Sequence, residues 1–106
     1  MVKSFKIILL ISFISLCLYA QDGSIKGTVN DSSGLPLADV NIKIKGSYIG
    51  TATDIDGKYE LNKVPQGEYI VQVSAIGYKT VEYTGIKVKK DEITTLIITL
   101  NTTSYT

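Results

Sequence analysis

GTATDIDGKYEL, residues 50–61, decides the fold of this chain because it predicts two short strands joined by an Asp-Gly turn. A two-residue hairpin turn needs positive φ at both central positions, which Gly57 adopts at little cost and Asp56 tolerates better than most residues. The carboxylate of Asp54 is expected to accept backbone N–H groups from the residues that follow it and so to lock the turn. We therefore predict a β-hairpin whose acidic residues are structural.

Polar and apolar residues alternate along most of the chain after residue 20, which is the period of a strand with one buried face. No stretch there has apolar residues at helical spacing, and turn formers such as DSSGLP and VPQG separate the alternating stretches. The pattern predicts an all-β fold, a seven-stranded antiparallel β-sandwich around one core. Besides the two arms of the hairpin, the expected strands include residues 24–30, 40–45, 68–75, a polar strand ending at Thr84, and 95–100.

The VPQG turn, residues 64–67, leads directly into one of these strands. Pro65 fixes one φ of the turn, and Gly67 is expected to supply a φ that other residues resist. Tyr69 follows on the apolar face of the next strand, so we expect a core aromatic ring with its hydroxyl at the rim.

Residues 1–20 predict a signal peptide helix that precedes a single domain of residues 21–106. Two lysines come before an apolar run, residues 7–18, that is too short to span a bilayer, and the small residue Ala20 precedes polar residues. Cleavage is expected after Ala20. The alternative is a lipoprotein acylated at Cys17, but the bulky Leu16 stands where a lipoprotein signal has Gly or Ala.

Composition excludes several classes of function. The formal net charge is +1 and the lysines are dispersed, so no field would attract nucleic acid. The chain has no His and its one Cys is Cys17, which leaves no ordinary nucleophile and base for an enzyme. The D-x-D-G run resembles a calcium loop, but that register puts Ala52 and Lys63 at positions that need carboxylates. We expect no enzyme, no metal site and no cofactor.

Three segments, in the order in which they occur, resemble the carboxypeptidase regulatory-like domain, a transthyretin-like sandwich: IKGTVNDSSGLPLADVNIKIKG, GTATDIDGKYEL and VPQGEYIVQVSAIGYKT. The similarity covers nearly all of the chain after residue 20. It implies that the matching positions serve turns and core rather than catalysis. They are Gly27, Pro36, Thr53, Asp54, Asp56, Gly57, Tyr59, Pro65, Gly67, Tyr69, Gly77 and Tyr78.

The resemblance also implies a biological setting. The domain is familiar as an N-terminal extension of outer-membrane TonB-dependent receptors in Bacteroidetes-type bacteria, which are exported by a similar signal. We therefore expect a non-catalytic module in the periplasm or at the outer membrane, with an outer-membrane receptor or another periplasmic envelope protein as partner. The sequence ends at Thr106, where a receptor would continue into a plug and a barrel, so we expect a free-standing module or a truncated reading frame.

Two other functions stay open as alternatives. Pilin and adhesin modules share this general sandwich, but the buried acid that would assist their internal Lys-to-Asn bond is missing around residues 73–75. A carbohydrate-binding module would stack a glycan on exposed aromatic rings. The chain has no Trp, so the candidate ligand contacts are Tyr48, before the central hairpin, and Tyr83, on the polar strand.

Overall fold

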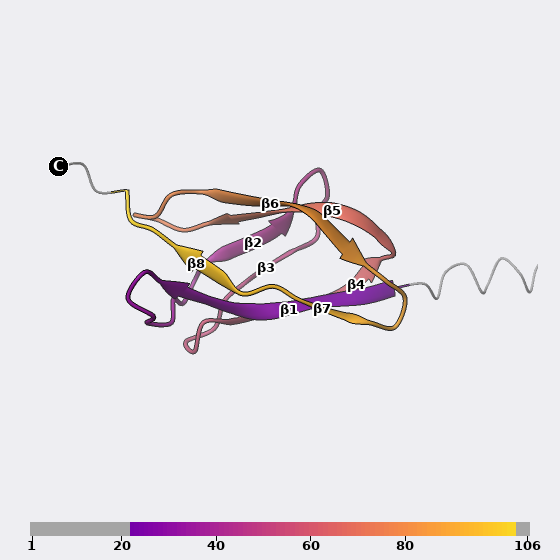
Figure 1. Cartoon of the computed structure of the whole chain (residues 1–106), viewed down its shortest axis with the longest axis horizontal. Coiled ribbons are helices and arrows are strands. Elements are labelled where there is room, and N and C mark those ends of the chain that lie inside the picture. Colours follow the sequence, from indigo (N-terminus) through magenta and orange to yellow (C-terminus); the bar gives the residue numbers. More distant parts are fainter. Residues whose placement is uncertain (1–21, 104–106) are drawn as a thin grey trace, which may run out of the picture.

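The computed structural model describes residues 22–103, which form eight β-strands and contain no helix that could cross a membrane (Figure 1). The predicted signal peptide helix, residues 1–20, lies outside the described residues. The strands are β1 (Asp22–Asp31), β2 (Asn41–Ile44), β3 (Gly50–Ala52), β4 (Lys58–Pro65), β5 (Gly67–Ser74), β6 (Val81–Val88), β7 (Ile93–Thr95) and β8 (Ile98–Leu100).

The strands form two sheets that face each other. One sheet has the order β4-β1-β7, with β8 also paired to β1, and the other has the order β3-β2-β5-β6. In Figure 1, β1 runs along one layer while β2, β5 and β6 lie in the other. The predicted all-β sandwich is therefore confirmed.

One apolar core lies between the sheets, because most inward positions of the strands are aliphatic or aromatic. In β2, for example, Ile42 and Ile44 are buried while Asn41 and Lys43 are exposed, which is the alternation expected from the sequence. The buried apolar residues are Ile25, Val29, Val40, Ile42, Ile44, Tyr59, Leu61, Val64, Val71, Val73, Val88, Ile98 and Leu100.

The predicted hairpin over residues 50–61 is wrong in its pairing. β3 pairs with β2, and β4 pairs with β1, so the two arms lie in different sheets. Within the turn, Gly57 alone has a positive φ, of 74°, and Asp56 does not. Local alternation identifies both strands, but it does not distinguish a hairpin within one sheet from a connection between two sheets.

The turn at residues 64–67 also connects the two sheets, and Gly67 does not have the positive φ that we expected. Instead Lys63 has a φ of 55°. The absence of a side chain on Gly67 makes room for the ring of Tyr69, since an added Cβ would lie 3.3 Å from its hydroxyl. That hydroxyl donates a hydrogen bond to the Pro65 carbonyl (2.6 Å), so Tyr69 packs against the core with its polar end at the rim, as predicted.

The last expected strand, residues 95–100, differs from the prediction in two ways. It is divided between β7 and β8, which makes eight strands rather than seven, and both pair with β1 in parallel rather than antiparallel. The parallel direction follows from the crossover after β6, which returns the chain to the start of β1. The sandwich is therefore mixed in strand direction.

Gly27 in β1 explains the division. The carbonyl of Leu96, between β7 and β8, lies so close to Gly27 that an ideal Cβ would be 1.8 Å from its oxygen. The Tyr59 hydroxyl donates a 2.5 Å hydrogen bond to this carbonyl, and the Leu96 amide donates to the Lys26 carbonyl. Gly27 and Tyr59 together therefore fix the place where the final strand bends.

We predict that Gly27→Ala destabilises the domain by about 3 kcal/mol or more, because the new methyl must displace a backbone carbonyl in a packed core. Thermal unfolding followed by circular dichroism measures this as a melting temperature lower by more than about 10 °C. Gly77→Ala is the matched control, since Gly77 has a φ of 87° but open space around its Cα, and its cost is about 1 kcal/mol. Equal losses in the two variants would contradict the contact with Leu96.

Candidate functional site

Three loops gather at the end of the sandwich where β1, β3 and β5 finish. Residue pairing puts Asn41 beside both Ala52 and Ser74, so the beginning of β2 and the ends of β3 and β5 lie together. The amide of Val29 donates to the Gly57 carbonyl, which brings the β3–β4 turn to the end of β1. We call this surface, residues 32–40, 53–57 and 75–80, the loop end.

Two of these loops have the same hydrogen-bonded structure. In DSSGL, residues 31–35, the Asp31 Oδ1 accepts the amides of Ser33 (2.9 Å) and Leu35 (3.0 Å). In addition, the Gly34 amide donates to the Asp31 carbonyl and the Asp31 amide to the Leu35 carbonyl. The loop is thus closed by its own first residue, in the manner of an Asx turn.

DIDGK, residues 54–58, repeats this arrangement bond for bond. The Asp54 Oδ1 accepts the amides of Asp56 and Lys58, both at 2.9 Å, which is the contact expected from the sequence. The Gly57 amide donates to the Asp54 carbonyl, and the Asp54 amide donates to the Lys58 carbonyl. The shared pattern D-x-x-G-x was present in the sequence, which predicted a turn at both copies but the loop-closing carboxylate only at Asp54.

Thr53 connects the two loops to the sheet. Its side chain is 4% exposed, and its hydroxyl donates to the Leu37 carbonyl (2.6 Å) and accepts the Val40 amide (3.0 Å). Its backbone amide donates to the Val40 carbonyl, and its carbonyl accepts the Asp39 amide. A single small polar side chain therefore satisfies main-chain groups where β2 begins.

Each loop of the loop end exposes one large aliphatic side chain to solvent. Leu35 is 63% exposed, Ile55 84% and Ile76 103%. The first two lie on adjoining loops, because the position of a Gly57 Cβ is 3.1 Å from Pro36 and 3.2 Å from the Leu37 amide. Isolated exposed aliphatic residues are common on protein surfaces, but their recurrence at neighbouring rigid tips makes the loop end the candidate contact surface.

The two candidate glycan contacts lie in unlike environments. Tyr48 is fully exposed in the β2–β3 loop. Tyr83 lies in β6, is half-buried and packs against the core beside Tyr59. Burial, together with this second tyrosine, raises the pKa of Tyr59 well above its ordinary value, so its hydroxyl stays a donor to Leu96. Tyr48 is thus an exposed ring on a loop, whereas Tyr83 packs toward the core, and the glycan contacts stay a prediction.

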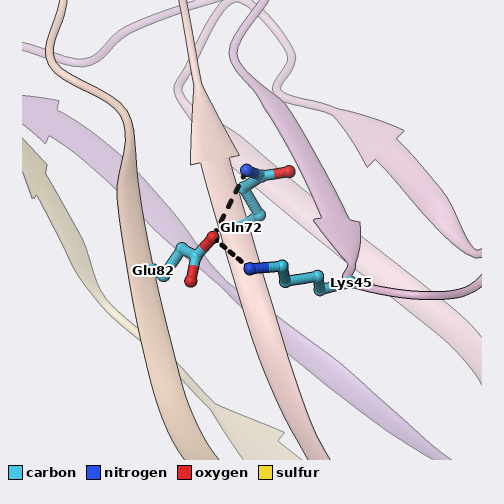
Figure 2. A network of polar contacts seen from close by, with 3 residues as sticks. All are labelled: Lys45, Gln72 and Glu82. Carbon is cyan, nitrogen blue, oxygen red and sulfur yellow. Dashed lines mark hydrogen bonds and ion pairs between the residues drawn. The ribbon is translucent and has the colours of Figure 1, made fainter.

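A polar network crosses the outer face of the second sheet (Figure 2). The Glu82 Oε1 on β6 accepts the Lys45 ammonium at 3.0 Å and the Gln72 side-chain amide at 3.5 Å. All three side chains are solvent-accessible, so the contribution of this ion pair to stability is at most about 1 kcal/mol. The network joins the end of β2, β5 and β6, which is a structural role.

The remaining motif residues lie at turns and strand ends. Pro36 is opposite Asn30 in an isolated bridge that continues β1, and Tyr78 is opposite Thr102. Gly77 has a φ of 87° in the β5–β6 loop. Among residues 22–103, every buried side-chain nitrogen or oxygen has a hydrogen-bond partner, and no three His, Cys, Asp or Glu side chains form a group that could hold a metal. The polar motif side chains described above contact backbone groups of this chain.

The family model of the carboxypeptidase regulatory-like domain matches residues 24–101. The chain belongs to this family. The matched range begins within β1 and extends past β8, so it contains the strands that form the core. The domain family predicted from the sequence motifs is therefore confirmed.

TonB-dependent receptors contain segments similar to this domain. The chain is 41% identical over 81 residues to the TonB-dependent receptor SusC of Bacteroides thetaiotaomicron, which covers 74% of the chain and 8% of that receptor. It is 35% identical over 79 residues to a TonB-dependent receptor of Formosa agariphila, again covering 74% of the chain and 8% of the receptor. The chain thus spans a small fraction of the length of these relatives.

Solved structures with the same fold have little sequence similarity to the chain. A chain in a type II cohesin–X-dockerin complex from Acetivibrio cellulolyticus aligns with a TM-score of 0.63 and 24% identity, covering 74% of this chain and 56% of that one. A minor pilin of Streptococcus agalactiae aligns with a TM-score of 0.60 and 15% identity, covering 83% and 48%. These similarities establish the sandwich fold alone.

We predict that Gly57→Val destabilises the domain more than Gly34→Val, although the two glycines occupy the same position in matching loops. Both have positive φ, 74° and 90°, so both variants carry backbone strain on the order of 1 to 2 kcal/mol or more. A Cβ at Gly57 would in addition lie 2.6 Å from the Val29 carbonyl, whereas Gly34 has open space. Urea unfolding of both variants measures the difference, and equal midpoints would contradict the packing of this turn on β1.

We predict a pH-dependent stabilisation by Asp31. The hydroxyl of Ser33, followed by the Leu35 amide, holds the pKa of this carboxyl below its ordinary value of 3.8. A carboxyl with a lowered pKa stabilises the fold above its unfolded pKa, and the effect is lost as the pH falls through the folded value. The stability difference between the parent and Asp31→Asn should therefore be constant above about pH 5 and shrink at lower pH.

Urea unfolding between pH 7 and pH 2.5 measures that difference. Ser33→Ala removes the first of the donors and so raises the folded pKa of Asp31 toward its unfolded value. In this background the effect of Asp31→Asn at neutral pH should be smaller, and its decline should be complete at a higher pH. A parent-to-Asn difference that does not change with pH would contradict the assignment.

Proposed function

We propose that this protein is a non-catalytic, exported interaction module associated with an outer-membrane TonB-dependent transport system. The observation that carries the proposal is the 41% identity to the TonB-dependent receptor SusC across 74% of this chain. The similar region is this domain, in which the polar motif side chains form hydrogen bonds with backbone groups of the same chain. A binding role fits such a domain better than a chemical one.

The polar residues that would be needed for chemistry are engaged in structure. Asp31 and Asp54 close their own loops, Thr53 ties β3 to the start of β2, and the Tyr59 hydroxyl holds the Leu96 carbonyl. In contrast, the loop end presents aliphatic side chains that are largely exposed and do not belong to the core cluster. Exposed aliphatic groups on rigid tips support a protein contact, because their burial against a partner is favourable.

Export and location are part of the proposal. Residues 1–20 have the basic start, short apolar run and small exit residue of a signal peptide. The relatives are receptors of the TonB-dependent class, so the proposed partner is an outer-membrane receptor or a periplasmic envelope protein that works with one. The module resides in the periplasm or at the periplasmic side of the outer membrane.

Affinity capture from the native envelope tests this function. The tagged chain should enrich an outer-membrane protein identified by mass spectrometry, and the double variant Leu35→Asp/Ile55→Asp should lower the enrichment by about tenfold, as loss of a buried aliphatic contact does. Ile93→Asp is the control, because this residue is 60% exposed and pairs with Ser24 at the start of β1, whereas the loop end lies where β1 finishes. Both the double variant and the control should melt within a few degrees of the parent.

Two results would contradict the proposal. One is the recovery of soluble glycans, or of nothing, with no outer-membrane protein enriched. The other is an equal loss of capture in the loop-end and control variants. A glycan array with Tyr48→Ala and Tyr83→Ala distinguishes the carbohydrate-binding alternative, which requires specific binding that these changes abolish.

A further inference from the structure

The outer edge of β3 has main-chain groups that no residue of the described chain covers. In an antiparallel pair, alternate residues direct their N–H and C=O groups toward the neighbouring strand. The carbonyl of Ile49 and the amide of Thr53 bond to β2, and Thr51 pairs with Ile42 between them. The amides and carbonyls of Gly50 and Ala52 therefore point away from the sheet.

The edge of β4, which faces β3 across the sandwich, is obstructed. Both main-chain groups of Lys58 are bonded to Asp54 at 2.9 Å. The positive φ of Lys63 bends the strand, and Pro65 has no N–H to offer. Between these points, Glu60 is paired with Lys26 at 3.5 Å. Charges, bulges and proline are the usual means by which a protein protects a sheet edge.

The edges on the opposite side are covered by other parts of the chain. In β6, Gly85 interrupts the strand with a φ of 68°, and the Lys87 carbonyl accepts the Thr94 hydroxyl at 2.8 Å. Beyond β8, the Asn101 carbonyl accepts the Lys79 amide, and the Thr103 amide donates to the Gly77 carbonyl. Compared with the edges of β4 and β6, the edge of β3 thus lacks charge, proline and bulge.

A groove of about 390 Å³ lies directly beside this edge, between β3 and β4. It is lined by Thr51, Ala52, Asp54, Lys58, Tyr59 and Glu60. Side chains of an added strand alternate between its two faces, so every second side chain of a segment paired with β3 would enter this groove. The β3 edge therefore has both unpaired backbone groups, on Gly50 and Ala52, and an adjacent groove that can receive the side chains of an added strand.

These features fit a flexible, extended segment better than a second copy of this domain. Two folded copies could align only the three residues of β3 with each other, and such a contact is far smaller than the roughly 1,200 Å² that a stable interface needs. An extended segment can instead follow the edge and fill the groove at the same time. Because the edge itself has no charged side chain, recognition depends on main-chain hydrogen bonds.

We propose that β3 is a strand-addition site, where Gly50 and Ala52 bind an extended segment of a partner protein by backbone pairing and the β3–β4 groove receives its side chains. This goes beyond the proposed function, since the pairing residues Gly50 and Ala52 lie outside the loop end, which shares only Asp54 with the groove, and the kind of partner differs. The site can therefore fail while the loop-end contact with an envelope receptor holds.

A library of unstructured ten-residue peptides displayed on phage provides the probe. The purified chain should select peptides that, as synthetic peptides, slow hydrogen exchange of the Gly50 and Ala52 amides by about tenfold or more in nuclear magnetic resonance spectra. Ala52→Pro removes the outward N–H and should weaken binding by at least about tenfold, because a main-chain donor is lost. Ala52→Val keeps the N–H and favours a strand, so it should bind within about threefold of the parent.

Several outcomes would overturn the proposal. They are failure to select any peptide, equal binding by Ala52→Pro and the parent, and protection confined to residues 31–35 or 54–58. Dimerisation of the chain through β3 in sedimentation experiments would also overturn it, since the occupant would then be a second copy. If Ala52→Pro does not fold, protection of the Gly50 and Ala52 amides in the parent decides the result alone.

Discussion

The hydrogen bond from the Tyr59 hydroxyl to the Leu96 carbonyl, made above Gly27, is the contact on which the arrangement of the sandwich depends. It joins β4, β1 and the segment between β7 and β8 inside one sheet. The net contribution of such a bond is about 1 kcal/mol, but a buried carbonyl without a partner costs about 1 to 3 kcal/mol. The bend of the last strand is thus tolerated because Tyr59 donates a hydrogen bond to the Leu96 carbonyl and Gly27 has no side chain that would clash with it.

At the loop end, too, a few polar side chains form hydrogen bonds with several backbone groups. Two aspartates close matching five-residue loops, and one threonine hydroxyl serves two backbone partners. Rigid loops keep the side chains at their tips, Leu35 and Ile55, in solvent rather than letting them fold onto the core. Acidic residues that resemble a site in the sequence therefore act as supports for an aliphatic surface.

Binding by this domain would then use two unlike properties of a sandwich. The loop end offers side chains on fixed tips, while the β3 edge offers backbone groups beside a groove. The edges of β4 and β6 are instead obstructed, by Lys63 and Pro65 in β4 and by Gly85 in β6. A domain whose edge strands differ in this way restricts where another chain can add to it.

The sequence by itself determined the all-β class, the position of most strands, the core positions such as Ile42, Ile44 and Val73, the turn-locking carboxylate of Asp54 and the domain family. These follow from local rules, since side-chain alternation and turn chemistry act over a few residues. Only the tertiary structure decided that β3 and β4 lie in different sheets, that β7 and β8 run parallel to β1, and that Gly27 lies against the Leu96 carbonyl. The accessible edge of β3 belongs to this second group. Whether a strand has a neighbour depends on the packing of residues far apart in the chain, and no local pattern records that neighbour.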